Sequence, residues 1–158
     1  MRARIGICLG AIAIAGAIPA LAGGAATSAG VVTHYRGAFD PGGKLTFEFG
    51  NRHHKHAVIG FAFTNFPLHC QHGTNSETGN LGYSVTIKER KFHTTAVYPA
   101  PPDAAQSTLH LTGEFSRDHS RAHGTMRVFG PHVAVEDTTH GPKDRCDSKT
   151  IDWVAHRT

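Results

Sequence analysis

Residues 44–65 read KLTFEFGNRHHKHAVIGFAFTN, and this stretch decides the fold class. Residues 44–49 alternate, with a leucine and two phenylalanines on one face and polar side chains on the other. A period of two is typical of a half-buried β-strand. Gly50 and Asn51 supply turn residues, and residues 57–65 are apolar on both faces, as in a central strand. The stretch therefore predicts two neighbouring strands with three histidines where they meet.

The same alternation recurs along the rest of the chain. Further strands are predicted at 83–88, at 91–98 as its hairpin partner, and at 107–115, 124–129 and 151–156, with a short edge strand at 131–135. Polar segments rich in turn residues, at 70–82, 116–123 and 138–149, are predicted to be loops. Seven or eight short strands without helical spacing predict a single-domain antiparallel β-sandwich, with a small closed β-barrel as the alternative.

The N-terminus has the layout of a secretory signal peptide. A basic start, MRAR, precedes an uncharged apolar run at 5–18, a proline and a small-residue site, Ala20-Leu21-Ala22. The run is too short to span a bilayer comfortably as a helix, although an uncleaved anchor is the alternative. We expect residues 1–22 to be the signal peptide, 23–32 a flexible lead-in and 33–158 the β domain of a secreted protein.

The numbers of basic and acidic residues limit the kinds of partner that the protein is expected to bind. The chain has 16 Lys and Arg against 12 Asp and Glu, and loss of Arg2 and Arg4 with the signal leaves 14 against 12, a net charge of +2. This value and the scattering of basic residues along the sequence argue against a nucleic acid or an anionic membrane as the partner. An extracellular protein or a glycan is the expected partner, no transmembrane span follows the signal, and the oligomeric state stays open.

The cysteine count predicts one disulfide. Cys8 would leave with the signal peptide, so Cys70 and Cys146 would be the cysteines of the mature chain. Two cysteines in an exported protein are expected to pair, and two free thiols are the alternative. The loop that the disulfide would close is long, which the chain-entropy model values at about 4 kcal/mol.

The 13 histidines are the oddity of the composition, because histidine changes charge between about pH 5 and pH 8. His53, His54 and His56 lie together in NRHHKH. In an extended segment residues two apart share a face, so His54 and His56 could hold a divalent transition metal weakly, with His53 beside them. A solvated turn is the alternative. His69 and His72 follow the next strand, so they should lie at its opposite end.

Catalytic motifs are missing from the sequence. There is no G-x-S-x-G elbow, and the acidic clusters, Glu136-Asp137 and Asp144 with Asp147, fall in a polar segment. Trp153 alternates with small and apolar neighbours and is predicted to be a core residue. The three tyrosines lie at strand ends, where an aromatic body with a polar tip makes a weak ligand candidate: Tyr35, Tyr83 and Tyr98.

The C-terminal run CDSKTIDWVAHR, residues 146–157, resembles the closing segment of small secreted β-rich proteins of actinobacterial type. Those proteins tend to end in C-D-S-G-T-x-x-W-x-A-x-R, with an earlier cysteine after a central strand, as Cys70 is here. This chain departs from the pattern at Lys149, where glycine is usual. The resemblance implies export and a β-rich fold. It carries over no catalytic or binding residue, because the family has no assigned activity.

Together these features predict a secreted, non-catalytic binding or interaction module whose ligand the sequence does not identify. A histidine-based metal-binding or pH-responsive extracytoplasmic protein is the alternative, and a hydrolase comes third. No cofactor is expected beyond a weakly held divalent transition metal.

Overall fold

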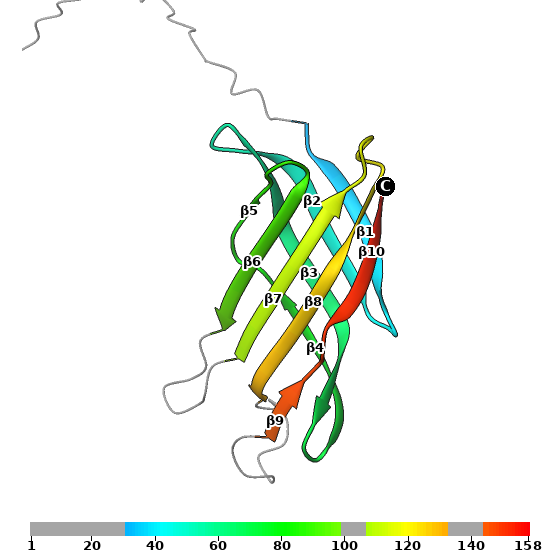
Figure 1. Ribbon diagram of the computed structural model, residues 1–158, viewed down its shortest axis with the longest axis vertical. Helices are drawn as coiled ribbons and strands as arrows, with labels where there is room; N and C mark the ends of the chain where they lie inside the picture. The colour runs from blue at the N-terminus through cyan, green and yellow to red at the C-terminus, as the bar shows by residue number, and fades with distance from the viewer. Residues whose placement is uncertain (1–30, 99–106, 133–143) are drawn as a thin grey trace, which may run out of the picture.

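A computed structural model describes residues 31–98, 107–132 and 144–158 (Figure 1). The described residues form β-strands and no helix. The strands are β1 (Thr33–Asp40), β2 (Lys44–Arg52), β3 (Lys55–Cys70), β4 (Gly73–Asn80), β5 (Val85–Thr86), β6 (Lys91–Tyr98), β7 (Ser107–Phe115), β8 (Arg121–His132), β9 (Asp144–Asp147) and β10 (Ile151–Arg157). The expected signal peptide, and residues 23–30 of the expected lead-in, lie outside the described residues. Within the described part of the chain, nothing has the helical length and hydropathy needed to cross a membrane.

The strands belong to one sheet that closes on itself. The neighbour order is β10-β1-β2-β3-β9-β8-β7-β6, and β10 also pairs with β8, so six strands form a closed barrel. Strands β6 and β7 extend the sheet beyond β8, while β4 and β5 pair with β3. In Figure 1, β6, β7 and β8 lie in front of β2 and β3. The all-β class is confirmed, and the architecture is the closed barrel rather than the sandwich, because β10 hydrogen-bonds to both β1 and β8 and joins the two faces.

The predicted disulfide between Cys70 and Cys146 is confirmed, with an S–S distance of 2.00 Å. The two cysteines face each other as a cross-strand pair of β3 and β9. The pairing of these two strands is short, because it includes besides the cysteines only His69 opposite Asp147. The covalent bond therefore reinforces one of the shortest contacts in the closed ring, and it joins neighbouring strands of one sheet rather than two packed sheets.

Aromatic rings fill the interior. Trp153 is 1% exposed, which confirms it as a core residue, and its ring lies edge-on to those of Phe47 and Phe61 at centroid distances of 6.0 and 6.1 Å. Each buried aromatic side chain contributes about 1.5–3 kcal/mol, and each ring pair about 0.5–1.5 kcal/mol more. Gly113 makes room for this packing, because a Cβ there would lie 2.2 Å from the Phe92 ring and 2.8 Å from the Trp153 ring.

Several elements differ from the sequence expectation. Residues 73–80, expected as loop, form strand β4, and residues 144–147 form strand β9. Strand β1 had no counterpart among the predicted strands. Of the strand expected at 83–88, only Val85–Thr86 is regular, and β6 pairs with β7 rather than with that segment, apart from one bridge between Lys88 and Lys91. Residues 133–135 of the expected edge strand lie outside the described residues.

Candidate functional site

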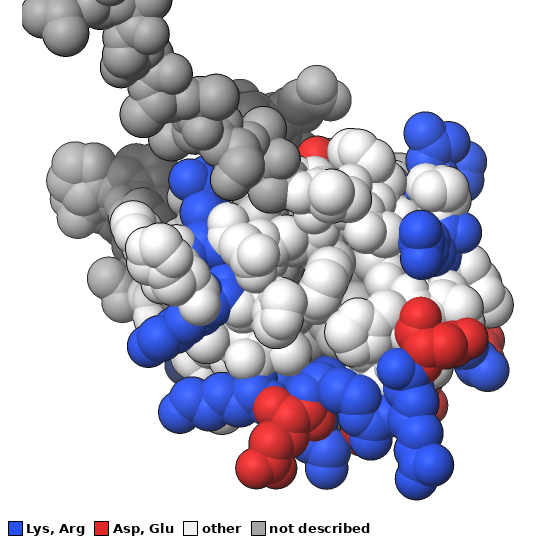
Figure 2. Space-filling model, turned by 90° about the horizontal axis from the view of Figure 1, so that it is seen from above, with Lys and Arg blue, Asp and Glu red and all other residues white. Residues whose placement is uncertain are grey.

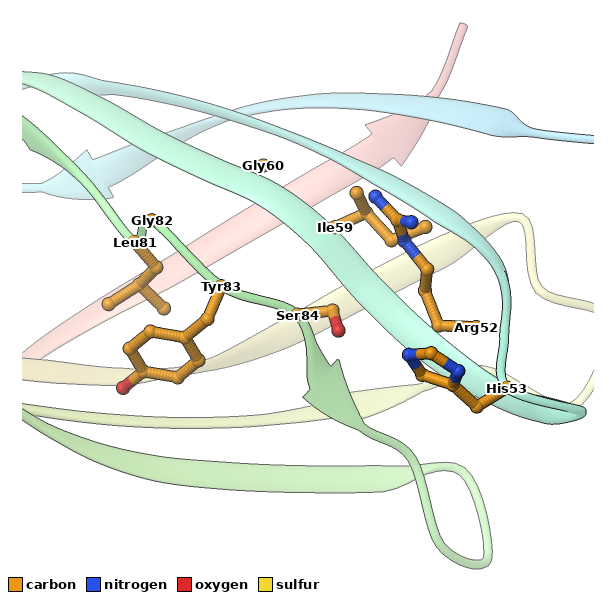
Figure 3. Close-up of a pocket in the computed structure, with 8 residues that line it drawn as sticks. All are labelled: Arg52, His53, Ile59, Gly60, Leu81, Gly82, Tyr83 and Ser84. Carbon is orange, nitrogen blue, oxygen red and sulfur yellow. The ribbon is translucent and has the colours of Figure 1, made fainter.

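A pocket of about 450 Å³ lies where the pairing of β3 with its neighbours is interrupted (Figure 3). Strand β5 pairs with Ala57 and Val58, and β4 takes over from Ala62 onward. Between them the chain leaves the ladder as a short connection. The pocket is lined by Arg52, His53, Ile59, Gly60, Leu81, Gly82, Tyr83 and Ser84.

Local sequence explains why the chain departs from the ladder there. Gly60 has a φ of +59°, a conformation that glycine adopts without strain, and the pairing of β2 with β3 shifts register between Thr46 and Glu48. Leu81 is buried, and its N–H donates to the Phe61 carbonyl at 2.8 Å. The connection is therefore anchored at its start, while the following residues stay at the surface.

The lining combines a cation, an aromatic ring and an apolar floor. Arg52 comes from the end of β2 and has no acidic partner among the described residues. The Tyr83 side chain is 46% exposed, and its hydroxyl is fixed by a 2.9 Å hydrogen bond with Thr94 Oγ1. Ile59 and Leu81 supply apolar surface, and Ser84 adds an exposed hydroxyl. None of the eight described lining residues is a carboxylate, so the pocket favours an anion that also carries an apolar or ring-shaped body.

The three histidines of NRHHKH have different surroundings. His53 lines the pocket, whereas His54 is exposed in the turn. Both have positive φ values, 49° and 63°, so the extended geometry assumed for His54 and His56 does not hold. The His56 ring stacks on Phe49 at 5.2 Å between centroids. No group of three potential metal ligands occurs within the described ranges, and metal binding by these histidines stays a prediction.

The other histidines considered from sequence lie where the strand count placed them. Strand β3 leads from the NRHHKH turn to Cys70, so His69 and the neighbouring His72 are at the opposite end of the barrel. This confirms that they are separated from His53 and His54.

Among the acidic residues, Asp147 from the sequence candidates and Asp118, which is not one of them, have structural partners, while Asp144 lies in β9 opposite His132. Asp147 accepts two hydrogen bonds from Arg127, at 2.9 and 2.8 Å, and these hold the pKa of its carboxyl well below the usual range. Asp118 accepts from the Ser116 hydroxyl and from the backbone and hydroxyl of Ser120, which lowers its pKa to about 2. Both carboxylates thus fix local structure. Glu136-Asp137 lies outside the described residues.

The tyrosines occupy three different environments. Tyr35 is in the core, its hydroxyl donates to the His119 carbonyl, and burial raises its pKa. The Tyr98 hydroxyl is buried without a hydrogen-bond partner among the described residues, and burial, together with Glu77 and Tyr83, raises its pKa to about 12. Tyr83 alone of the three lines the pocket. Sequence reasoning identified His53 and Tyr83 but gave no signal for Arg52 or Ser84, because only the pairing of β5 with β3 brings the two segments together.

Comparison with known proteins adds no relative: no family model matches the chain, and neither the curated proteins nor the solved structures contain a match.

Proposed function

We propose that this protein is a secreted, non-catalytic binding module that holds an acidic sugar in the pocket formed by the β2–β3 turn and residues 81–84. The observation that carries the proposal is a pocket lined on one side by an exposed tyrosine ring and on the other by an arginine without an acidic partner in the described chain (Figure 3). The volume of about 450 Å³ falls within the range of small-ligand sites.

Each part of a uronic acid has a counterpart in the lining. The apolar face of a pyranose ring suits the Tyr83 side chain, which a hydrogen bond to Thr94 holds in place. The carboxylate suits the Arg52 guanidinium, whose planar fork binds carboxylates in pairs of hydrogen bonds. Ser84 and the backbone around Gly60 and Gly82 offer further hydrogen-bonding groups to sugar hydroxyls.

Secretion is part of the proposal. It is supported by the signal-like N-terminus and by the Cys70–Cys146 disulfide, which forms and persists in oxidising compartments. N-terminal sequencing of protein recovered outside the cytoplasm is expected to find a chain that starts at Gly23. A chain that retains residues 1–22 would contradict secretion as a free protein.

The test is calorimetric titration of the chain lacking residues 1–22 with a uronic-acid disaccharide and with its neutral counterpart. We expect the acidic sugar to bind more tightly, Tyr83→Ala to abolish binding, and Arg52→Gln to weaken it about tenfold or more, as loss of a charged hydrogen bond does. Arg36→Gln is the matched control, because Arg36 is an exposed arginine on β1 outside the pocket. Equal affinity for both sugars, or equal effects of the two arginine variants, would contradict the proposal.

A further inference from the structure

The fold gathers basic residues that are scattered along the sequence. One end of the barrel, here called the cationic end, consists of residues 31–33, the turns at 51–56, 87–91 and 116–121, and residues 156–158. Figure 2 looks onto this end and shows Lys and Arg side chains around much of its rim, with an uncharged centre. The net charge of the whole chain is close to neutral, but the basic side chains are therefore distributed unevenly over the barrel.

Most of these cations are not neutralised within the described chain. The side chains without an ion pair to a described residue are Arg52, Lys55, Lys88, Arg117, Arg121 and Arg157. Arg90 and Lys91 share Glu114, and the acidic residues of the described turns are Glu89 and Asp118. The opposite half is close to balanced, with the described acidic residues Asp40, Glu77, Asp144, Asp147 and Asp152 against Lys44, Arg127, Arg145 and Lys149.

Histidines are concentrated at the same end. Five of the 13 lie there, His53, His54, His56, His119 and His156, and His34 and His123 lie just beyond its bounds. Any protonation of these side chains adds positive charge to a surface that is already cationic.

Their neighbours come from every adjoining strand. His34 Nδ1 lies 3.4 Å from Glu48 Oε1. In the strand pairings His123 lies opposite Glu114 and Val154. His156 lies opposite Arg36 and Arg121. His53 and His54 lie between Arg52 and Lys55, with Tyr83 and Ser84 across the pocket from His53. His56 is opposite Asn51 and stacks on Phe49, and His119 follows Asp118 and packs on Phe49 and Phe115. Acidic residues are therefore too few among these neighbours to cancel the added charge.

Exposed apolar side chains lie beside the cations. Val31 is 89% exposed and Val32 42% exposed, and both immediately precede β1 at the cationic end. The described chain therefore begins at this end. Cations together with exposed valines match the boundary between lipid headgroups and acyl chains better than they match a fully hydrated polyanion.

We propose that the cationic end docks on an anionic phospholipid surface, and that its histidines strengthen this binding as the pH falls. The cationic end shares Arg52 and His53 with the pocket, but most of its cations, among them Arg117, Arg121 and Lys88, do not line the pocket and can be varied separately. Each basic residue near an anionic membrane surface raises the partition coefficient about fivefold at low salt.

The test measures co-sedimentation of the chain lacking residues 1–22 with vesicles of phosphatidylcholine alone and of phosphatidylcholine with phosphatidylglycerol. We expect binding to the anionic vesicles only, stronger at about pH 5.5 than at about pH 7.5, and reduced by added salt. Arg117→Gln/Arg121→Gln should lower the partition coefficient about 25-fold. Lys44→Gln/Arg145→Gln, at the opposite end, is the matched control and should leave it unchanged. His54→Asn/His156→Asn should reduce the gain at low pH.

Three results would overturn the proposal. One is absence of binding to anionic vesicles at both pH values. Another is an equal loss in the two charge variants, each shown by circular dichroism to be folded. The third is saturable binding to a soluble sulfated polysaccharide without binding to vesicles, which would identify a polyanion rather than a membrane as the partner. The measurements on the wild-type protein at different pH and salt concentration test the proposal even where a variant fails to fold.

Discussion

At the scale of single residues, Lys149 shows how the structure uses a departure from a sequence pattern. Its φ is +60°, a left-handed conformation that glycine adopts at little cost and lysine rarely does. The C-terminal pattern that this chain resembles has glycine at that position. The backbone N–H of Lys149 donates to Asp147 Oδ1 at 2.8 Å, so the turn is held by main-chain contacts that any residue can make.

Lys149→Gly is therefore expected to raise the free energy of unfolding by about 0.5–1 kcal/mol, because relief of left-handed strain exceeds the added freedom of the unfolded chain. The lost Lys149 Nζ contact to Asp147, at 3.2 Å, is exposed and contributes little. Urea unfolding curves measure the change. Lys149→Ala is the control, since it loses the same contact and keeps the strain. A glycine variant no more stable than the alanine variant would refute this reading of the turn.

Tyr98 gives a prediction in the alkaline range. Burial raises its pKa to about 12, above the ordinary value of 10.0, so the folded state binds the phenol proton more tightly than the unfolded state does. This contribution to stability is present below about pH 10 and is lost as the pH rises toward 12.

Tyr98→Phe should remove that alkaline loss and make stability less dependent on pH above about 10. At neutral pH it should not destabilise the protein, because the Tyr98 hydroxyl is buried without a partner among the described residues and its removal leaves none of their acceptors unpaired. Thermal melts from neutral to alkaline pH measure both effects, with Tyr83→Phe as the control. A variant that loses stability above pH 10 as steeply as the wild type would show that Tyr98 is not the titrating group.

At the scale of strands, alternation predicted the elements that have one buried face. β2, β7 and β10 lie where the apolar period of two placed them. β4 has no such period, since its sequence is GTNSETGN. It forms as the hairpin partner of β3, from Cys70 opposite Gly73 to Ala62 opposite Asn80, and part of that stretch of β3 is also paired with β2. Pairing with a preformed neighbour overrides local propensity here, so the sequence of β4 carries no alternation.

The disulfide also acts at the scale of strands, because it links β3 and β9 where their pairing is short. Replacing both cysteines, as Cys70→Ala/Cys146→Ala, should lower the free energy of unfolding by about 4 kcal/mol on the chain-entropy model. The amides of β9 should exchange with solvent earlier than those of β2, whose pairings with β1 and β3 are long. Hydrogen exchange measures the order, and addition of reductant to the double variant is the control. Unchanged protection in β9 would mean that the β3–β9 pairing does not depend on the covalent link.

At the scale of the whole molecule, closure of the sheet creates features that no segment contains. The pocket joins residues 52–53 to residues 81–84, and the cationic end joins three turns with the two ends of the described chain. The sequence indicated export, the disulfide partners and a possible role for His53. It predicted a sandwich and gave the closed barrel, which the structure shows, only as the alternative, because strand alternation is the same in both. Because the basic residues are scattered along the sequence, the sequence alone argued against an anionic partner. The strand order then places many of these residues at one end of the barrel.

The most direct measurement of the pocket proposal is a two-dimensional ¹H–¹⁵N NMR titration of the chain lacking residues 1–22 with a uronic-acid disaccharide. We expect saturable shifts confined to the amides of residues 52–53, 59–60 and 81–84, with the rest of the barrel unmoved. Shifts centred elsewhere, or no shifts at concentrations typical of weak sugar binding, would contradict a sugar site at this pocket.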